Sequence, residues 1–214
     1  MPAANTHLAV RQNRVDEVVT ALVRTIPGSC VLWQGSPGAG TSDAYSDIDL
    51  AWIVPDAEFE RAVAETAAAL GRIAPLVEAR AKPQLARSRR RRLLFVRFAD
   101  MPLLWHLDLD VRCASIADDG SFDSDDPDAR SEDGWSRPAS ALANAIAAVK
   151  ALGRGRTDFA LGTLSLGFER IGLPPPPAAS RATIVALADA CADRDASLRS
   201  LASQVHELAD EILG

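Results

Sequence analysis

The sequence predicts an α/β (α+β) fold, in which a mixed sheet core precedes a C-terminal antiparallel helical domain. Residues 30–111 contain short apolar runs of strand length, separated by glycine, proline and aspartate. Beyond residue 136 the chain is rich in alanine and leucine at helical spacing. A strongly acidic segment without periodicity lies between the two patterns. We therefore divide the chain into residues 1–116, a linker over 117–135, and residues 136–214.

The first part of the chain is predicted to mix helices and strands. We expect a helix over 8–23, strands over 30–33 and 48–54, a helix over 56–72, and strands over 76–81, 93–98 and 103–111. Pro27-Gly28 ends the first helix, and Asp56 is suited to cap the second because its carboxylate can accept a hydrogen bond from the first turn. The turn-like residues 99–102 join the last two strands as a hairpin.

The last part of the chain is predicted to be helical throughout. Apolar residues recur every three or four positions over 142–152 and again over 198–212. The four prolines 174–177 cannot be helical, so they mark a stiff connection between two helix pairs. The helix over 196–213 has an apolar seam that serves either the internal core or a dimer. A monomer and a homodimer therefore both stay open.

Charge is unevenly distributed along the chain. Residues 118–133 carry eight acids and one base, a local charge of −7, so the rest is near +1 because the total is −6. We interpret this segment as an exposed linker, with an acidic wall that attracts a cationic substrate as the alternative. Basic residues cluster in only one run, so no nucleic-acid partner is expected.

Cysteine usage and hydropathy favour a cytoplasmic protein. Cys30, Cys113 and Cys191 are too few and too scattered for a disulfide framework or a paired metal motif. No stretch approaches the roughly 18 apolar residues of a membrane helix, and residues 1–13 lack an apolar signal region. We therefore expect a soluble chain without membrane contact.

A glycine-rich loop followed by two aspartates is the most informative stretch of the sequence. Its glycines allow backbone N–H groups to approach a phosphate chain, and Ser36 can donate a hydroxyl hydrogen bond. In the strand that follows, Asp47 and Asp49 share one face because side chains alternate. Two carboxylates placed in this way repel each other unless a cation lies between them. Magnesium suits this place, since it prefers hard oxygen ligands and leaves room for phosphate oxygens.

A second strand repeats the pattern. Within residues 105–111, His106, Asp108 and Asp110 share the face opposite to three apolar side chains. A third acid is therefore available, and three acids on neighbouring strands can hold two cations about 3.5–4 Å apart. Whether Asp108 or Asp110 is this acid stays open. We interpret His106 as a partly buried histidine bonded to a neighbour, with a general base as the alternative.

Gly35-Ser36, ten intervening residues and then Asp47-Ile48-Asp49 resemble the signature of the polymerase-beta-like nucleotidyltransferase superfamily. The likeness is greatest to the aminoglycoside- and lincosamide-type members and to the minimal nucleotidyltransferases, and it covers residues 31–111. The resemblance implies that residues 1–116 form a catalytic domain. The implied catalytic residues are Asp47, Asp49 and Asp108, the implied metal ligands are Asp47, Asp49, Asp108 and Asp110, and the implied nucleotide-binding residues are Gly35, Ser36, Gly40 and Ser46.

The function that the resemblance implies is a metal-dependent nucleotidyltransferase. It would use two Mg²⁺ ions, or Mn²⁺, and transfer a nucleoside monophosphate from ATP or another nucleoside triphosphate to a hydroxyl of a small molecule. An aminoglycoside or lincosamide is the leading acceptor; the excess of acids would attract a polycationic aminoglycoside. The alternatives are a protein-nucleotidylating, antitoxin-like minimal nucleotidyltransferase and a catalytically retired interaction module.

One departure from the family pattern concerns the cation near the loop. Many relatives carry an arginine between the Gly-Ser pair and the next glycine, where this chain has Gly38-Ala39-Gly40. Arg87 or the run Arg89 to Arg92 could compensate as a phosphate-binding cation. The alternative is that these arginines form a solvated turn or contact the acidic linker.

Overall fold

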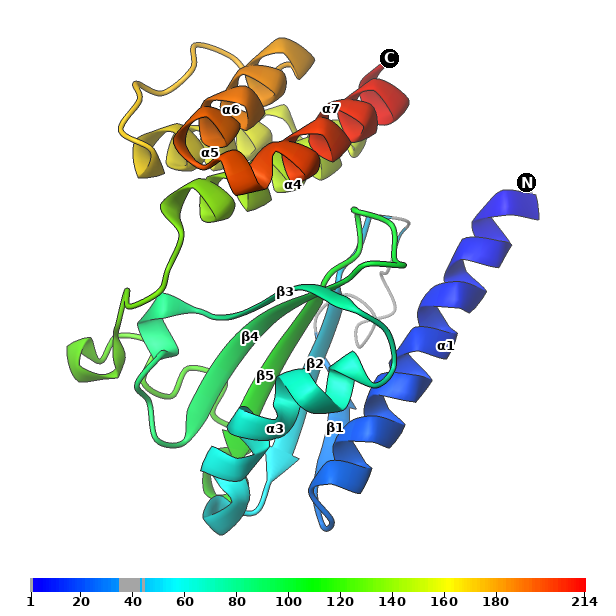
Figure 1. Cartoon of the computed structure of the whole chain (residues 1–214), viewed down its shortest axis with the longest axis vertical. Helices are drawn as coiled ribbons and strands as arrows, with labels where there is room; N and C mark the ends of the chain where they lie inside the picture. Colours follow the sequence, from blue (N-terminus) through cyan, green and yellow to red (C-terminus); the bar gives the residue numbers. More distant parts are fainter. Residues whose placement is uncertain (1, 35–42, 44) are drawn as a thin grey trace. The chain divides into compact units, whose positions relative to one another are not determined.

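A computed structural model describes residues 2–34, 43 and 45–214, with the backbone alone for residues 2–8. The chain divides into two compact units, Met1–Trp135 and Ser136–Gly214, which we call unit 1 and unit 2. Unit 1 contains the sheet and unit 2 is helical (Figure 1), which confirms the predicted fold class. Unit 2 begins at the residue where the sequence pattern changes.

The described strands of unit 1 form one mixed sheet in the order β1-β2-β5-β4-β3 (Figure 1). Their bounds are β1 Cys30–Trp33, β2 Ile48–Val54, β3 Leu76–Ala81, β4 Arg91–Phe98 and β5 Leu107–Cys113. β2 and β5 are parallel, and the other neighbours are antiparallel. The predicted hairpin is the β4–β5 pair. Its second strand begins at Leu107 and not at residue 103, because residues 103–104 form a turn.

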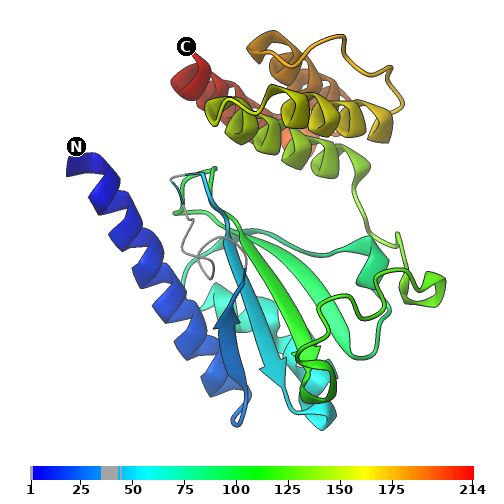
Figure 2. The same ribbon diagram turned by 180° about the vertical axis from the view of Figure 1, so that it is seen from behind.

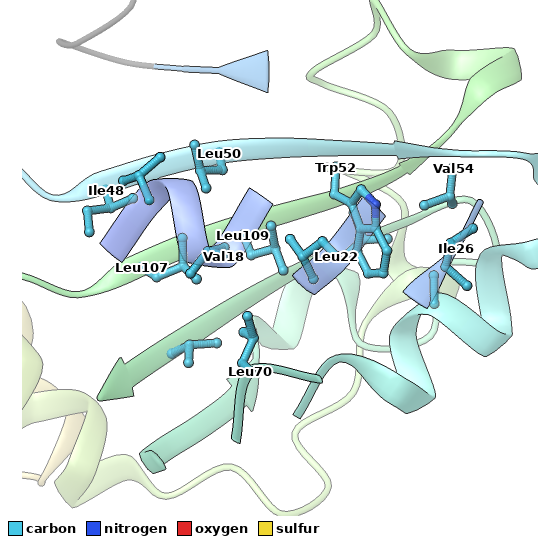
Figure 3. Packing of buried hydrophobic residues seen from close by; sticks show 14 of the residues in the cluster. Val18, Leu22, Ile26, Ile48, Leu50, Trp52, Val54, Leu70, Leu107 and Leu109 are labelled. Carbon is cyan, nitrogen blue, oxygen red and sulfur yellow. The ribbon is translucent and has the colours of Figure 1, made fainter. Parts of the chain in front are cut away.

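Two helices, α1 (Pro2–Thr25) and α3 (Phe59–Gly71), build the core on one face of the sheet. Leu22 of α1 packs among the inward side chains of β2 and β5, which include Leu50 and Leu109 (Figure 3). Trp52 is fully buried in this layer, as expected from its place in the strand, and its indole N–H donates a 2.9 Å hydrogen bond to Ser29 Oγ. The helices therefore bury the apolar side chains that alternate along both strands.

The acidic segment, expected to be an exposed linker, is mostly exposed and also forms hydrogen bonds with the rest of unit 1. The Arg87 backbone N–H donates to the Ala129 carbonyl at 2.8 Å, and the Ser131 N–H donates to the Pro83 carbonyl at 2.9 Å. Ala129 is buried, and the Arg87 guanidinium lies 2.8 Å from the Asp133 carboxylate. Backbone hydrogen bonds and ion pairs thus order a segment that has too few apolar residues to order itself.

Unit 2 consists of α4 Arg137–Gly153, α5 Thr157–Arg170, α6 Arg181–Arg194 and α7 Arg199–Leu213. Ser136 caps α4 by accepting a hydrogen bond from the Ala139 N–H, and Ser180 forms a capping box with Thr183 at the start of α6. The proline run connects α5 to α6, as predicted. Across the described part of the chain, no helix combines the length and the apolar character that a membrane crossing requires.

Candidate active site

We call the face of the sheet opposite to α1 and α3 the open face; it can be followed in the ribbon of Figure 2, and the strand register places many charged residues on it. In the described part of unit 1, no α-helix lies across it. The residues whose strand positions place them on this face are Asp49, Glu78, Arg80, Arg91, Leu93, Phe95, Arg97, Asp108, Asp110 and Arg112. Asp47 and His106 immediately precede β2 and β5, and His106 contacts both Asp47 and Asp108.

The structure brings together three of the predicted aspartates. Asp49 on β2 stands directly opposite Asp108 on the parallel strand β5, and Asp47 lies two residues before Asp49 on the same face. Neighbouring strands are about 4.8 Å apart, so these positions crowd three carboxylates at one end of the open face. Each of the three side chains is half-buried. Such carboxylates are stable together only with positive charge close by.

His106 supplies part of that charge. Its Nδ1 lies 2.8 Å from Oδ1 of Asp47, and its Nε2 lies 2.8 Å from Oδ1 of Asp108. Burial alone would lower the pKa of His106, but its contacts with Asp108 and Asp47 outweigh burial and raise the pKa to about 9. His106 is therefore a protonated bridge between two aspartates at neutral pH, and it is bonded to its neighbours as expected.

The donor set of this cluster fits a hard divalent cation. Carboxylate oxygens are the protein ligands that Mg²⁺ prefers. Oδ1 of Asp108 is buried and accepts no well-aligned hydrogen bond. Its contact with His106 Nε2 has the distance of an ion pair but not the geometry of a hydrogen bond. Among the residues with described placement, no group of three or more acids, histidines or cysteines is arranged around a common metal position. Asp47, Asp49 and Asp108 are the residues that would hold such an ion.

Asp110 lies in a different environment from the other aspartates. Its side chain is almost fully buried, and both oxygens accept hydrogen bonds from Arg91, with three contacts between 3.0 and 3.2 Å. Arg112 donates two further hydrogen bonds to Oδ2, at 2.7 and 3.0 Å. The carboxylate proposed from sequence as a fourth metal ligand is thus enclosed by two guanidinium groups. Asp108 is the third acid that the geometry favours.

A short turn positions Asp47. The Asp43 carboxylate accepts hydrogen bonds from the Tyr45 N–H and from the Ser46 hydroxyl, and Arg11 of α1 donates to the carbonyls of Asp43 and Ser46. Ser46 is buried, and its hydroxyl holds this turn, whereas the sequence assigned it to nucleotide binding. The other residues of that assignment, Gly35, Ser36 and Gly40, lie outside the described residues.

The basic run mostly serves the fold. Arg87 pairs with Asp133 of the acidic segment, Arg91 binds Asp110, and Arg92 lies 5.7 Å from the ring centroid of Phe59 on the helix-covered side. Arg87 and Arg91 therefore make the contact with the acidic linker that the sequence offered as the alternative, Arg87 through Asp133 and Arg91 through Ser124 Oγ. Sequence reasoning missed Arg97 and Arg80, which lie on the open face near the aspartates. The alternation Arg91, Leu93, Phe95, Arg97 is the signal that could have placed Arg97 there.

A scan against models of protein families and a search of curated proteins gave no match to this chain.

Proposed function

We propose that this protein is a metal-dependent nucleotidyltransferase, which transfers a nucleoside monophosphate from a nucleoside triphosphate, with ATP as the donor, to a hydroxyl group of a small molecule. The observation that carries the proposal is the register that sets Asp49 opposite Asp108, with Asp47 on the same face. Three carboxylates on adjacent strands of a sheet face without a helix are suited to divalent ions and a phosphate chain.

In the reaction, one bond to the α-phosphorus forms and another bond to it breaks. The acceptor oxygen attacks this phosphorus and forms a new P–O bond, the bond to the bridging oxygen of the β-phosphate breaks, and pyrophosphate leaves with that electron pair. Bound divalent ions would supply charge neutralisation for the phosphate oxygens.

The hydroxyl proton requires an acceptor among the chain's own groups. Asp110 is poorly suited because both of its oxygens accept hydrogen bonds from arginine. His106 is already protonated at neutral pH, since its pKa is about 9. Asp108 has a buried oxygen without a well-aligned hydrogen bond, so we assign the proton to its carboxylate, from which it passes to solvent.

Release of pyrophosphate from Mg²⁺ and ATP, measured against a panel of hydroxylated acceptors, tests this proposal. The panel includes an aminoglycoside, a lincosamide and a denatured protein mixture, so that small-molecule and protein acceptors are distinguished. We expect acceptor-dependent release that falls at least about 10²-fold in Asp49→Asn and is retained in Asp125→Asn, an exposed acid outside the site. Equal activity in Asp49→Asn and the parent would contradict the assignment.

A further inference from the structure

A second charged group lies beside the aspartates on the open face. Arg97 on β4 pairs in register with Glu78 on β3, and Arg80 pairs with Phe95, which in turn stands opposite Asp108. We call Glu78, Arg80 and Arg97 the arginine cluster. It lies on the same face, one or two strands away from Asp108 and two or three strands away from Asp47 and Asp49, which is within reach of one extended ligand.

Arg97 has the least satisfied guanidinium of the cluster. The residue is 6% exposed, yet its Nε and Nη1 are buried without a hydrogen-bond partner. Its contact with Glu78 is 3.5 Å from Nε to Oε2, beyond the usual range of a charged hydrogen bond. Buried guanidinium donors in folded proteins are normally paired. Arg97 therefore has donors that none of the described residues satisfies.

Two other buried arginines of the open face have hydrogen-bond partners for their guanidinium groups. Arg91 and Arg112 are as deeply buried as Arg97, at 7% and 6% exposure. Arg91 donates to Asp110 from Nε and Nη2 and to Ser124 Oγ from Nη1, while Arg112 donates to Asp110 and to the Ala117 carbonyl. Burial on this face does not by itself leave an arginine unpaired. Among the described arginines of the open face, Arg97 and Arg80 have buried donors without a partner; outside this face, Arg14 of α1 has them as well.

Arg80 is held in place by aromatic rings. Its guanidinium carbon lies 4.1 Å from the ring centroid of Trp135 and 5.0 Å from that of Phe95, and it also pairs with Glu78. Its Nη1 is buried without a hydrogen-bond partner, like the donors of Arg97. Stacking fixes the plane of a guanidinium without using its N–H groups. Arg80 thus offers a positioned donor next to Arg97.

Next to each other on the open face lie an acidic group, which we call the aspartate pole, and the arginine cluster. The aspartate pole consists of Asp47, Asp49 and Asp108 and is acidic, while the arginine cluster, with two arginines and one glutamate, has a formal charge of +1. A metal-bound polyphosphate has the complementary pattern, since divalent ions are attracted to the carboxylates and phosphate oxygens to the guanidinium groups.

We propose that Arg97 and Arg80 form an oxyanion subsite that binds a phosphate group of the substrate. This inference rests on the proposed function and extends it, because it assigns a phosphate contact to β3 and β4. The shared chemistry is a phosphate oxyanion in contact with a guanidinium fork. Its source is either the polyphosphate of the nucleotide or a phosphate on the acceptor, and the experiment distinguishes the two.

The test follows the Nε–H signals of the arginines by NMR in the full chain, assigned with Arg97→Lys and Arg80→Lys. Inorganic pyrophosphate is added first without metal, then a nonhydrolysable ATP analogue with Mg²⁺, then glycerol 3-phosphate. Pyrophosphate affinity is measured in parallel by calorimetry. Arg92→Lys is the matched control, because Arg92 lies on the same strand but contacts Phe59 on the other side.

We expect pyrophosphate to shift the Arg97 signal and to bind at least about tenfold more weakly to Arg97→Lys than to Arg92→Lys. A shift by the ATP analogue identifies the nucleotide as the source, and a shift by glycerol 3-phosphate alone identifies the acceptor. Normal Mg²⁺-dependent binding of the analogue without any Arg97 shift would overturn the subsite and leave the proposed function standing. If pyrophosphate shifts the Arg97 signal but the ATP analogue does not bind, the subsite stands and the proposed function is overturned. If neither pyrophosphate nor the analogue binds, the subsite and the proposed function are both overturned. The shift itself is measured on the parent chain, and a cooperative thermal melt of each lysine variant shows that its spectrum and affinity belong to folded protein.

Discussion

At the scale of single residues, His106 stabilises two aspartates that would otherwise repel each other. Its pKa rises from 6.5 to about 9 because Asp108 and Asp47 outweigh the effect of burial. A raised folded-state pKa stabilises the fold fully below the unfolded value of 6.5, and this contribution is lost as pH rises through about 9. The shift corresponds to at most about 3–4 kcal/mol, at about 1.36 kcal/mol for each pKa unit.

Chemical denaturation of metal-free protein at pH 6 and pH 10 measures this contribution. We expect the free energy of unfolding to fall between the two values in the parent and to change less in His106→Gln. Parallel pH profiles for the two proteins would show that His106 is not the bridge described here.

Loss of the Asp110 carboxylate should lower stability, whereas loss of the Asp108 carboxylate should remove nucleotide binding. Asp110→Asn leaves two buried arginines without their carboxylate, so we expect a loss of about 3–5 kcal/mol in unfolding free energy. Asp108→Asn removes a half-buried group and should cost far less stability while removing Mg²⁺-dependent nucleotide binding. Thermal melts and calorimetry on both variants make the comparison. An Asp110→Asn protein that melts like the parent would contradict the structural role of Asp110.

At the scale of elements, the helices of unit 2 pack closely at one glycine. A Cβ at Gly167 of α5 would meet Leu187 Cδ2 at 2.7 Å and Asn144 Cβ at 3.1 Å, whereas a Cβ at Gly162 meets nothing within 4 Å. We expect Gly167→Ala to destabilise the protein by about 1–3 kcal/mol through overpacking. Gly162→Ala should stabilise it by about 0.5–1 kcal/mol, because alanine is the better helix former. Equal melting temperatures for the two variants would show that α5 does not pack as described.

The same scale explains what could be predicted from sequence. The period-two alternation of residues 47–54 and 105–111 is local, so it places Asp47, Asp49, His106 and Asp108 on one face without knowledge of the fold. Which strands are neighbours is not local. The parallel pairing of β2 with β5, and the arrival of Arg91 beside Asp110 from β4, depend on the order of strands in the sheet.

The environment of Arg97 could not be predicted from the sequence. Its strand is predictable, but its burial and its unpaired donors arise from the packing of β3 against β4, about twenty residues apart in sequence. The order of the acidic segment could not be predicted for a related reason. Its order comes from hydrogen bonds with Pro83 and Arg87, which a local composition argument does not contain.

At the scale of the whole molecule, the chain combines a sheet unit that has one polar face with a helical unit that has its own core. We propose that the aspartates of the open face form a working metal and nucleotide site. All of the residues that this claim uses come from unit 1.

Isothermal titration of the full chain with a nonhydrolysable ATP analogue, with and without Mg²⁺, tests this claim most directly, beside the double variant Asp47→Asn, Asp49→Asn. We predict binding that requires Mg²⁺ and is lost in a double variant that melts cooperatively like the parent. Mg²⁺-independent binding of equal strength in the parent and the double variant, or no binding to well-folded parent protein, would contradict it.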